Sequence, residues 1–374
     1  MKLMYLLTEP FGVGGVQSDM LALSKDLVKE GDEVYVASTP GVMLDELQSR
    51  GAKFVDLDFQ FKGLIGMLKV GFKLRKFIKQ EKIEILAPQS VRSTIASFIC
   101  LRIIPFSYKV KSTRKKLAIV TTIHNIHNPM HFKYGGIILN ICSDYVIFES
   151  HYERNRLIKS GLGELKSSVI HSGIDTEKFL PHEPNNKLLQ EYGLDKSIHS
   201  IFGIVARLSE EKGHQYLLKA FAKVLTKNEN ARLIIVGDGP LLDETKAISK
   251  SLNLDDSVIF TGLKRNVAEH LSMFDVFVLS STRESFPLAA REAMAAGKAV
   301  IAPRIGGCPE VVDENNTGYL FEAANVDDLA SCMQKIIVAE KFIEFGKKSR
   351  QRVVDLFSRK QWVVGDKAIY MSYL

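Results

Sequence analysis

Short apolar runs alternate with longer amphipathic segments along the whole chain, and this alternation predicts strands followed by helices. In the first half the apolar runs predict strands over residues 2–7, 33–38, 53–57, 83–87, 117–122, 145–148 and 168–171. In the second half they predict strands over residues 201–206, 232–236, 258–260, 276–279, 299–302 and 318–320. Strands that alternate with helices are typical of parallel sheets, so the predicted fold class is α/β.

The length of the chain favours two domains over one. Its 374 residues exceed what a single hydrophobic core of ordinary size organises. The polar stretch from Pro181 to Gly193 contains two prolines and two asparagines without a hydrophobic period, which marks it as the connection. We therefore predict one domain over residues 1–184 and a second over residues 185–356.

Two carboxylates, Glu284 and Glu292, lie on either side of a predicted helix start in the second half. Glu284 falls in a polar loop that follows the apolar run 276–279, and open α/β sheets bind ligands at this end of their strands. Glu292 lies about two turns along the helix and can face the same crevice. Carboxylates accept hydrogen bonds from sugar hydroxyls. Two solvated ends of a surface helix would give the same pattern, so that alternative stays open.

Two cations, Arg207 and Lys212, lie in the loop that follows the predicted strand 201–206. Arginine offers a planar fork and lysine a point charge, and together they can clamp a diphosphate. The free amides near Phe286 and Leu288, at the predicted helix start, also suit a phosphate. Hydroxyl-binding acids and phosphate-binding cations together indicate a nucleotide-sugar, although a solvated loop remains the alternative for the cations alone.

Seven motifs in order resemble those of the retaining glycosyltransferases of family 4. They are GGVQ (14–17), HSGIDTEKF (171–179), GIVARLSEEKG (203–213), IIVGDGP (234–240), FTGL (260–263), ESFPLAAREAMAAGKAVIAP (284–303) and GGCPEVV (306–312). The resemblance covers nearly the whole chain. It implies a GT-B architecture, with two Rossmann-like domains facing a central cleft: residues 1–184 bind the acceptor and residues 185–356 the donor. A last helix, over residues 357–374, would pack back on the first domain.

The resemblance also implies roles for individual residues in a sugar transfer that needs no metal and no cofactor besides the donor. Glu284 would hold sugar hydroxyls, Glu292 the ribose, and His124 the sugar from the first domain. The implied catalytic residues are Glu284, His124, Arg207 and Lys212. The implied substrate-binding residues are Gly14, Gly15, Arg207, Lys212, Gly237, Gly262, Leu263, Glu284, Phe286, Pro287, Leu288 and Glu292. Ser285 and Arg291 depart from the usual motif, so the donor's sugar stays open.

A group of histidines follows the predicted strand 117–122. His124, His127 and His131 could suggest a metal, but no nearby carboxylate or cysteine completes a ligand set, and we predict none. A structural cap or a hydrogen-bonded neighbour is the other interpretation of His124. The D-x-D pattern of Asp56 and Asp58 is interpreted as surface.

Positive charge is concentrated in the first half, where residues 1–180 hold 25 Lys and Arg against 18 Asp and Glu. The segment 62–116 alone holds 14 cations and two acids. A helix there would place lysines on one face and apolar residues opposite, which suits an anionic membrane surface. A solvated lysine face is an equal alternative, and no nucleic-acid recognition motif accompanies the charge. The predicted membrane-surface residues are Lys62, Lys69, Lys73, Lys76, Lys115 and Lys116.

These features predict where the protein works and which rivals remain. The first apolar run is six residues long, no stretch reaches eighteen, and the four cysteines form no C-x-x-C pair. We expect a cytoplasmic glycosyltransferase, peripheral on the inner face of the membrane, that acts on a lipid-linked acceptor in bacterial polysaccharide, lipopolysaccharide or glycan biosynthesis. Another GT-B nucleotide-sugar enzyme, such as an epimerase, and a non-catalytic membrane partner remain alternatives. Donor base, sugar, acceptor, linkage and oligomeric state stay open.

Overall fold

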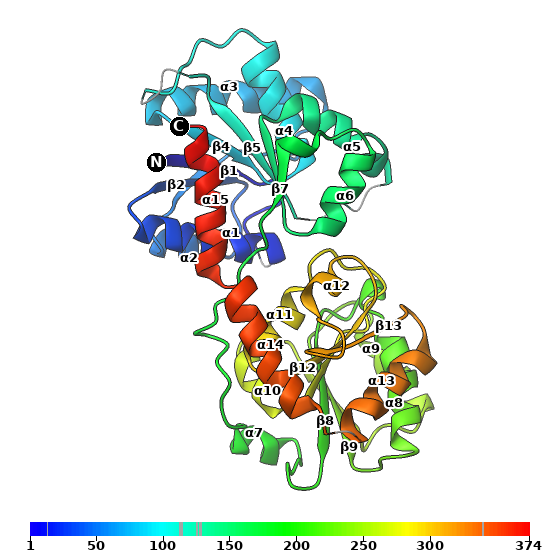
Figure 1. Ribbon diagram of the computed structural model, residues 1–374. Coiled ribbons are helices and arrows are strands. Elements are labelled where there is room, and N and C mark those ends of the chain that lie inside the picture. Colours follow the sequence, from blue (N-terminus) through cyan, green and yellow to red (C-terminus); the bar gives the residue numbers. More distant parts are fainter. Residues whose placement is uncertain (13, 112–114, 125, 127–128, 339) are drawn as a thin grey trace. The chain divides into compact units, whose positions relative to one another are not determined.

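The protein divides into two compact units (Figure 1), Met1–Gly173 with Arg359–Leu374, and Ile174–Ser358. The computed structural model describes residues 1–374 apart from 13, 112–114, 125, 127–128 and 339, and apart from the side chains of 64 and 129–131. Each unit carries one parallel sheet with helices around it, so the predicted α/β class and the two Rossmann-like domains are confirmed.

The first unit is built on a seven-stranded sheet. Its strands are β1 (Lys2–Leu6), β2 (Glu33–Ser38), β3 (Lys53–Asp56), β4 (Ile85–Pro88), β5 (Ala118–Ile123), β6 (Tyr145–Phe148) and β7 (Ser167–Val169). They lie in the order β3-β2-β1-β4-β5-β6-β7, and neighbours are parallel. The order reverses between β1 and β4, and ligands bind at such a switch point in open α/β sheets.

The second unit repeats this plan with six strands. They are β8 (Ser200–Val205), β9 (Ala231–Val236), β10 (Val258–Gly262), β11 (Val276–Val278), β12 (Ala299–Pro303) and β13 (Gly318–Phe321). Their order is β10-β9-β8-β11-β12-β13, again with parallel neighbours. Here the order reverses between β8 and β11, so the loops after these two strands flank the switch point.

Helices connect the strands in both units. The first unit contains α1 (Gly15–Lys29), α2 (Leu44–Ser49), α3 (Gly63–Glu81), α4 (Val91–Phe98), the π-helix η1 (Ile99–Ile103), α5 (Pro129–Cys142), α6 (His151–Lys159), η2 (Glu164–Lys166) and α15 (Arg359–Ser372). The second unit contains α7 (Asn186–Glu191), η3 (Glu210–Lys212), α8 (His214–Leu225), α9 (Leu242–Ser251), α10 (Val267–Met273), α11 (Leu288–Ala295), α12 (Cys308–Val311), α13 (Val326–Val338) and α14 (Phe342–Leu356). Within the described ranges, none of them combines the length and apolar character needed to cross a bilayer.

Every predicted strand is present, with ends that differ by at most two residues from the expected ones. Shifts of two residues occur at the end of β7, at the end of β10 and at the start of β4, which begins at Ile85 and not at residue 83. The backbone amide of Ile83 still bonds back to the carbonyl of Ile78, because Lys82 ends α3 in the left-handed conformation. The residue therefore closes the helix before the strand starts.

The units divide at Gly173 and Ile174, earlier than the boundary predicted at residues 184 and 185. Ile174 and Phe179 are buried in a hydrophobic cluster of the second unit. The side chain of Arg350, on α14, donates to the carbonyls of Thr176 and Phe179. The segment before the polar stretch is therefore anchored to the second unit by packing that composition alone does not reveal.

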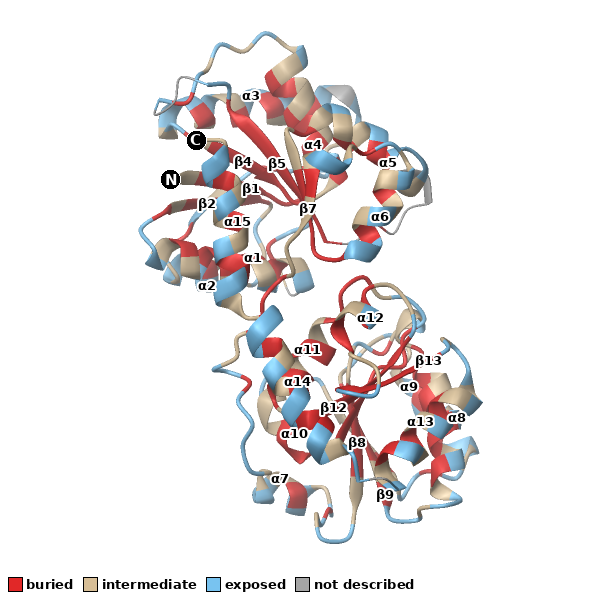
Figure 2. Cartoon of the chain, in the orientation of Figure 1, coloured by how far each residue is buried: buried red, intermediate tan, exposed pale blue. Residues whose placement is uncertain are grey.

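The cores follow the sheets, and the central strands are buried along their length (Figure 2). The last helix, α15, belongs to the first unit, where Trp362, Val363 and Tyr370 pack with Leu3 and Tyr5 of β1. Its entry is fixed by the guanidinium of Arg359, which pairs with Asp26. The expected return of the last helix to the first domain thus has a packing basis.

Candidate active site

The second unit brings together a lysine and a glutamate that the sequence places far apart. The ammonium of Lys212, at the end of η3, lies 2.7 Å from Oε1 of Glu284, in the loop after β11. The hydroxyl of the buried Ser281 donates to the same oxygen at 2.7 Å. The side chain of Glu284 is 9% exposed and that of Lys212 is 26% exposed, so the pair remains reachable from solvent.

Backbone contacts hold the two loops that carry this pair. Ser280 donates its hydroxyl to the carbonyl of Lys212 at 2.9 Å, and the amide of Thr282 donates to Glu211 at 2.8 Å. Gly213 has φ +63°, and a Cβ there would lie 2.3 Å from the carbonyl oxygen of Ser280. Only glycine fits this position, which explains why the loop after β8 can approach the loop after β11 so closely.

A third loop, which precedes α12, supports the backbone of Glu284. A Cβ on Gly306 would lie 1.7 Å from the Glu284 carbonyl oxygen, and φ at Gly306 is +54°. The next residue but one, Cys308, is fully buried, and burial and the charge of Glu284 raise the pKa of its thiol well above the ordinary value. The thiol is therefore neutral, and Cys308 packs as a small apolar residue.

The other residues expected at this site lie at the carboxyl ends of β8, β9 and β10. Arg207 follows β8 and is exposed to solvent. The amide of Gly237, after β9, donates to the carbonyl of Gly262 at 3.0 Å, and Leu263 is 77% exposed. The backbone amide of Leu208, after β8, donates to the carbonyl of Asp238, after β9. These strand ends therefore lie side by side, as a parallel sheet requires.

The helix start after Glu284 differs slightly from the prediction. Pro287 lies just before α11 and has an extended ψ of 109°, so the helix begins at Leu288 and not with Pro287 in its first turn. Phe286 is buried, and the guanidinium of Arg291 stacks 4.1 Å from its ring centre. Arg291 is 1% exposed and also reaches the carbonyls of Phe286 and Pro287. This unusual residue thus fixes the loop that carries the candidate phosphate-binding amides.

Glu292, on α11, has an altered acidity. The side chain is partly buried, and desolvation raises the pKa of its carboxyl to about 7, although Lys178 and Arg291 oppose the shift. About half of the population therefore carries a proton at neutral pH. A group with this property at a strand-end crevice is typical of a binding site.

In the first unit, His124 follows β5 and is held at both ring nitrogens. Its Nδ1 lies 2.8 Å from Oε1 of Glu149, and its Nε2 lies 2.8 Å from Oε1 of Gln89. Gln89 follows β4, and its own amide nitrogen donates to the carbonyl of Ala87 at 3.0 Å. All three side chains of this group are buried. A direct hydrogen bond from His124 to a sugar would have to displace Glu149 or Gln89.

Carboxylates also gather around His124, and the expectation that none lies nearby was wrong. Donor atoms of Asp19, His124 and Glu149 all lie within 4.8 Å of one another. Asp19 comes from α1 and Glu149 from the end of β6, so the sheet brings together residues that are distant in sequence. Such a set can hold a cation in principle. His127 and the side chain of His131 lie outside the described residues.

The glycine pair near β1 has the position expected of it. Gly14 is the N-cap of α1, and its carbonyl accepts from the amide of Ser18 at 2.9 Å. Gly15 begins the helix and is exposed. The pair therefore lies at the carboxyl end of β1, one strand from the end of β4.

The basic helix of the first unit is amphipathic, as predicted. On α3, Lys69, Lys73 and Lys76 are exposed, and Lys62 precedes the helix, also exposed. The opposite side buries Met67, Leu74 and Ile78 among the core residues of the sheet. The exposed side also carries two large apolar residues, Ile65 at 72% and Phe72 at 60% exposure. Neither Ile65 nor Phe72 was among the predicted membrane-surface residues.

A small cavity continues the basic region beyond α3. It measures about 250 Å³ and is lined by Leu101, Arg102, Phe106, Ser107, Tyr108, Lys109, Lys116 and Leu117. Lys115 and Lys116 also line a second, more open cavity with Arg102 and Tyr373. Arg75 links α3 to this region, because its guanidinium lies near the rings of both Phe72 and Phe106.

Known proteins share this chain's sequence and fold. Residues 13–178 match the family described as Glycosyltransferase Family 4, and residues 194–353 match Glycosyl transferases group 1. The N-acetyl-alpha-D-glucosaminyl L-malate synthase of Bacillus anthracis is 30% identical over 323 residues, 82% of this chain and 79% of that protein. The chain belongs to glycosyltransferase family 4. It is a glycosyltransferase with the GT-B fold.

A second relative of this glycosyltransferase is named for a diphosphoundecaprenol acceptor, and two solved structures share its fold. The UDP-Gal:alpha-D-GlcNAc-diphosphoundecaprenol alpha-1,3-galactosyltransferase of Escherichia coli is 26% identical over 321 residues, which cover 83% of this chain and 80% of that enzyme. A solved glycosyltransferase from Rickettsia africae has a TM-score of 0.85 and 21% identity, over 99% of this chain and 98% of that one. Anabaena HepE, solved with UDP and glucose, has a TM-score of 0.81 and 21% identity over 100% of both chains.

Proposed function

We propose that this glycosyltransferase moves a sugar from a nucleoside-diphosphate sugar to a lipid-linked acceptor, with retention at the anomeric carbon and without a metal ion. The observation that carries the proposal is the pairing of Lys212 with Glu284 at 2.7 Å, at the switch point of the second sheet. An ammonium suits the diphosphate of a donor, and a carboxylate suits the hydroxyls of its sugar. The diphosphoundecaprenol acceptor named for the E. coli relative supports the lipid-linked part.

The proposed chemistry is electrostatic stabilisation of the leaving diphosphate. Lys212, Arg207 and the amides of Phe286 and Leu288 would neutralise the charge that develops as the glycosidic bond breaks. Groups that are already in place cost little reorganisation at that moment, which is why such stabilisation often dominates catalysis. We assign no side chain as general base, because a leaving phosphate oxygen can take the acceptor's proton in same-face transfer.

The carboxylates have separate roles in this proposal. Lys212 and Ser281 both contact Oε1 of Glu284, which leaves Oε2 to accept from a sugar hydroxyl. In its ionised form, the carboxylate of Glu292 would accept hydrogen bonds from the ribose. The ends of β9 and β10 would border the donor, through Gly237, Gly262 and Leu263.

His124, Gly14 and Gly15 belong to the first unit and are proposed to act on the sugar and the acceptor. Because both ring nitrogens of His124 are already bonded within its own unit, His124 would act on the sugar without offering a free ring nitrogen.

We further propose that the first unit binds an anionic membrane surface through α3. The exposed face of this helix combines Lys69, Lys73 and Lys76 with the apolar Ile65 and Phe72. Lysines gain from anionic headgroups, and exposed apolar side chains gain from entering the interface. Peripheral binding on the cytoplasmic face would bring the enzyme to a lipid-linked acceptor.

The decisive test measures release of free nucleoside diphosphate from a panel of UDP-, GDP- and ADP-sugars. Each donor is offered alone and with a bacterial lipid extract, beside the Lys212→Ala protein. One outcome is that a single donor releases nucleoside diphosphate only when the extract is present, and only with the wild-type protein. That result supports the transferase and identifies the base and the sugar of its donor. A changed nucleotide-sugar formed without acceptor would point to an epimerase. Folded protein that binds no donor of the panel would contradict the proposal.

A further inference from the structure

A buried cluster of ionisable groups surrounds His124 in the first unit, and sequence motifs did not reveal it. Three carboxyl side chains approach the ring: Asp19 from α1, Glu149 from the end of β6, and Asp366 from α15. The exposed fractions are 7% for His124, 7% for Glu149 and 1% for Asp366. Such a concentration of acids around one histidine fixes the ring's protonation through its hydrogen bonds.

The orientation of Gln89 decides the state of one ring nitrogen. Its amide nitrogen donates to the carbonyl of Ala87, so its amide oxygen is the atom that faces Nε2 of His124. An amide oxygen only accepts hydrogen bonds, and Nε2 must therefore carry a proton. A flipped amide would leave the Ala87 carbonyl without this donor and would place two donors face to face.

The second ring nitrogen faces a carboxylate. Nδ1 lies 2.8 Å from Oε1 of Glu149, and an ionised carboxylate again only accepts. With acceptors on both sides, the ring satisfies both bonds only when both nitrogens are protonated. The imidazolium and the Glu149 carboxylate then form a buried pair with no net charge.

Asp366 completes the cluster with an oxygen that lacks a partner. Within the described part of the chain, Oδ1 of Asp366 is buried and makes no hydrogen bond. Trp362 hydrogen-bonds to the Asp366 carboxyl, but a second negative charge beside Glu149 with one oxygen unpaired would still be costly to desolvate. A neutral acid avoids that cost and leaves the single charge of Glu149 to the imidazolium.

We propose that Glu149 and Gln89 are positioning residues that hold His124 as a fixed imidazolium, and that Asp366 lies beside this pair as a neutral acid. Both N–H groups are then used inside the first unit. His124 offers the substrate its positive charge and the face of its ring, and not a free hydrogen-bonding nitrogen.

The electrostatics of the neighbouring groups agree with this arrangement. Burial alone would lower the pKa of His124, but the Glu149 carboxylate, aided by Asp19, raises it above the ordinary value. Burial and the Glu149 carboxylate raise the pKa of Asp366 to about 8. Two phenols, Tyr5 of β1 and Tyr370 of α15, also face Asp366, and burial holds their pKa values well above the ordinary one, so both stay neutral.

The catalytic consequence rests on the proposed function. A fixed positive charge attracts an anionic donor and stabilises negative charge that develops on its leaving group, whereas a neutral imidazole does neither. Removing the charge of Glu149 while keeping its shape should leave His124 neutral. The turnover number should then fall, and the donor's KM should change less.

Nuclear magnetic resonance of the ring nitrogens tests the protonation state without any substrate. The full chain is labelled with ¹⁵N-histidine, and the signals of His124 among the nine histidines are identified by their loss in His124→Asn. We expect two protonated ring nitrogens in the wild-type protein at pH 7.5, the pH at which the variants are compared. In Glu149→Gln we expect one protonated and one bare nitrogen at pH 7.5. Glu164→Gln, which changes an exposed acid of the same unit, should leave the signals unchanged.

Two results would overturn the proposal. One is a neutral His124 in wild-type protein at pH 7, which needs no variant to observe. The other is stoichiometric loss of a ring proton on addition of Zn²⁺ or Mg²⁺, which would make the cluster a metal site. The nucleoside diphosphate assay is independent: a charged His124 with no transfer would contradict the proposed function alone. Glu149→Asp keeps the negative charge, and Glu149→Gln keeps the shape without the charge. Turnover that recovers only in Glu149→Asp would show that the charge of Glu149 matters, and not its packing alone.

Discussion

Lys212 and Glu284 bind each other, although the proposed reaction needs them for opposite ends of the donor. Nζ of Lys212 lies 2.7 Å from Oε1 of Glu284, which also accepts from Ser281. A bound diphosphate would compete with Glu284 for the ammonium. The contact therefore holds both side chains in place, and Oε2 of Glu284 stays available to a donor.

Loss of Lys212 should remove activity and leave the fold intact. Lys212→Ala deletes the ammonium, but the hydroxyl of Ser281 still donates to Glu284. The Glu284 side chain therefore keeps one of its two contacts. Removing one preorganised charge-stabilising donor typically lowers turnover about 100- to 1000-fold. Steady-state release of nucleoside diphosphate measures the effect, and thermal unfolding checks the fold.

Lys223→Ala is the matched control for this prediction. Lys223 also pairs with an acid in the second unit, Asp327, but both side chains are more than half exposed. An exposed ion pair contributes about 0–1 kcal/mol to stability, and neither residue of this pair belongs to the candidate site. Turnover within threefold of wild type in both variants would refute the site assignment.

The strands were predictable from sequence because buried parallel strands are continuous apolar runs. Residues 118–123 and 299–303 are buried throughout, and the sequence places both strands within two residues. The sequence predicted that Lys212 and Glu284 belong to the same site, but it did not predict that they contact each other. Their direct contact depends on the approach of two loops that Gly213 permits.

The cluster around His124 was not predictable in the same way. Gln89 and Glu149 each follow a strand, a signal that marks many residues without function. Asp366 lies on a helix 217 positions after Glu149 and carries no local signal. Only the neighbouring positions of β4, β5 and β6 in the sheet, with the return of α15, bring these residues together.

Donor affinity should rise with pH through about 7 because of Glu292. Its pKa is raised to about 7, and only the ionised form accepts hydrogen bonds from two ribose hydroxyls. Below that pH the proton must be removed on binding, which weakens affinity by up to about tenfold per pH unit. Calorimetric titration of a nucleoside diphosphate between pH 6 and 8.5 measures the trend.

Glu292→Gln separates this effect from titration of the nucleotide's own phosphate. The amide does not titrate, so the variant should keep only the pH dependence that comes from the ligand. Glu244→Gln, an exposed acid at the start of α9, should behave as wild type. Identical pH profiles in wild type and Glu292→Gln would show that Glu292 does not bind the ribose in its ionised form.

Basic residues on α3 should set membrane affinity if the proposed docking surface is right. Reversing Lys69, Lys73 and Lys76 to Glu removes three favourable charges, each worth about 1 kcal/mol at an anionic surface. Vesicle binding should therefore fall by a factor of roughly 100 or more. Sedimentation with vesicles of anionic and of neutral lipid, across a salt series, measures it.

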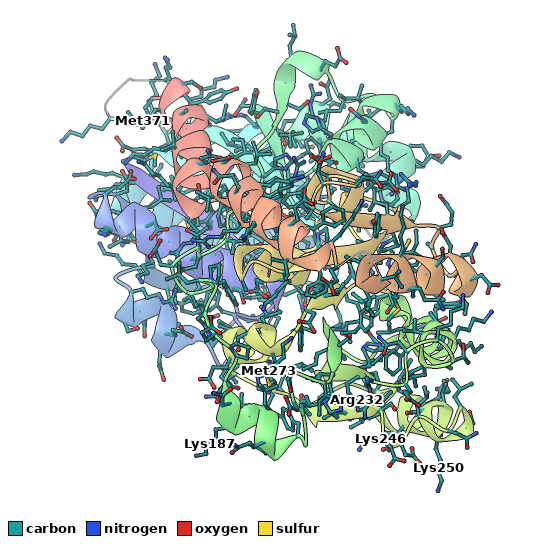
Figure 3. The ribbon with its side chains drawn as sticks, turned by 60° about the horizontal axis from the view of Figure 1, so that its bottom comes forward. Lys187, Arg232, Lys246, Lys250, Met273 and Met371 are labelled. Atoms are coloured by element: carbon teal, nitrogen blue, oxygen red, sulfur yellow. The ribbon has the colours of Figure 1, made fainter. Side chains whose placement is uncertain are left out.

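A charge-matched control comes from the second unit. Lys219, Lys246 and Lys250 are exposed on α8 and α9, and Figure 3 shows Lys246 and Lys250 pointing outward from the chain. Reversal of these three gives the same net charge change at a different place. Phe72→Ser tests the apolar part of the face separately. Equal loss in both charge-reversed proteins would show a net-charge effect and contradict a docking surface on α3.

Asp366 should make the stability of the protein fall as pH rises from about 4 to 8. Its pKa is raised from 3.8 to about 8 in the folded state, so the native protein keeps a proton that the unfolded chain has lost. Folded-state stability contributed by this proton is complete below about pH 4 and disappears progressively as pH rises toward 8. The slope reaches at most about 1.4 kcal/mol per pH unit.

Asp366→Asn does not titrate, so its thermal midpoint should change less between pH 5 and 8 than that of wild type. Below about pH 4 the two midpoints should be similar, because the folded and the unfolded wild-type chain then both keep the proton, and at pH 8 the variant should be the more stable. A parallel pH dependence in both proteins would mean that Asp366 is ionised in the fold, and the single positive charge of His124 would then be shared between two carboxylates.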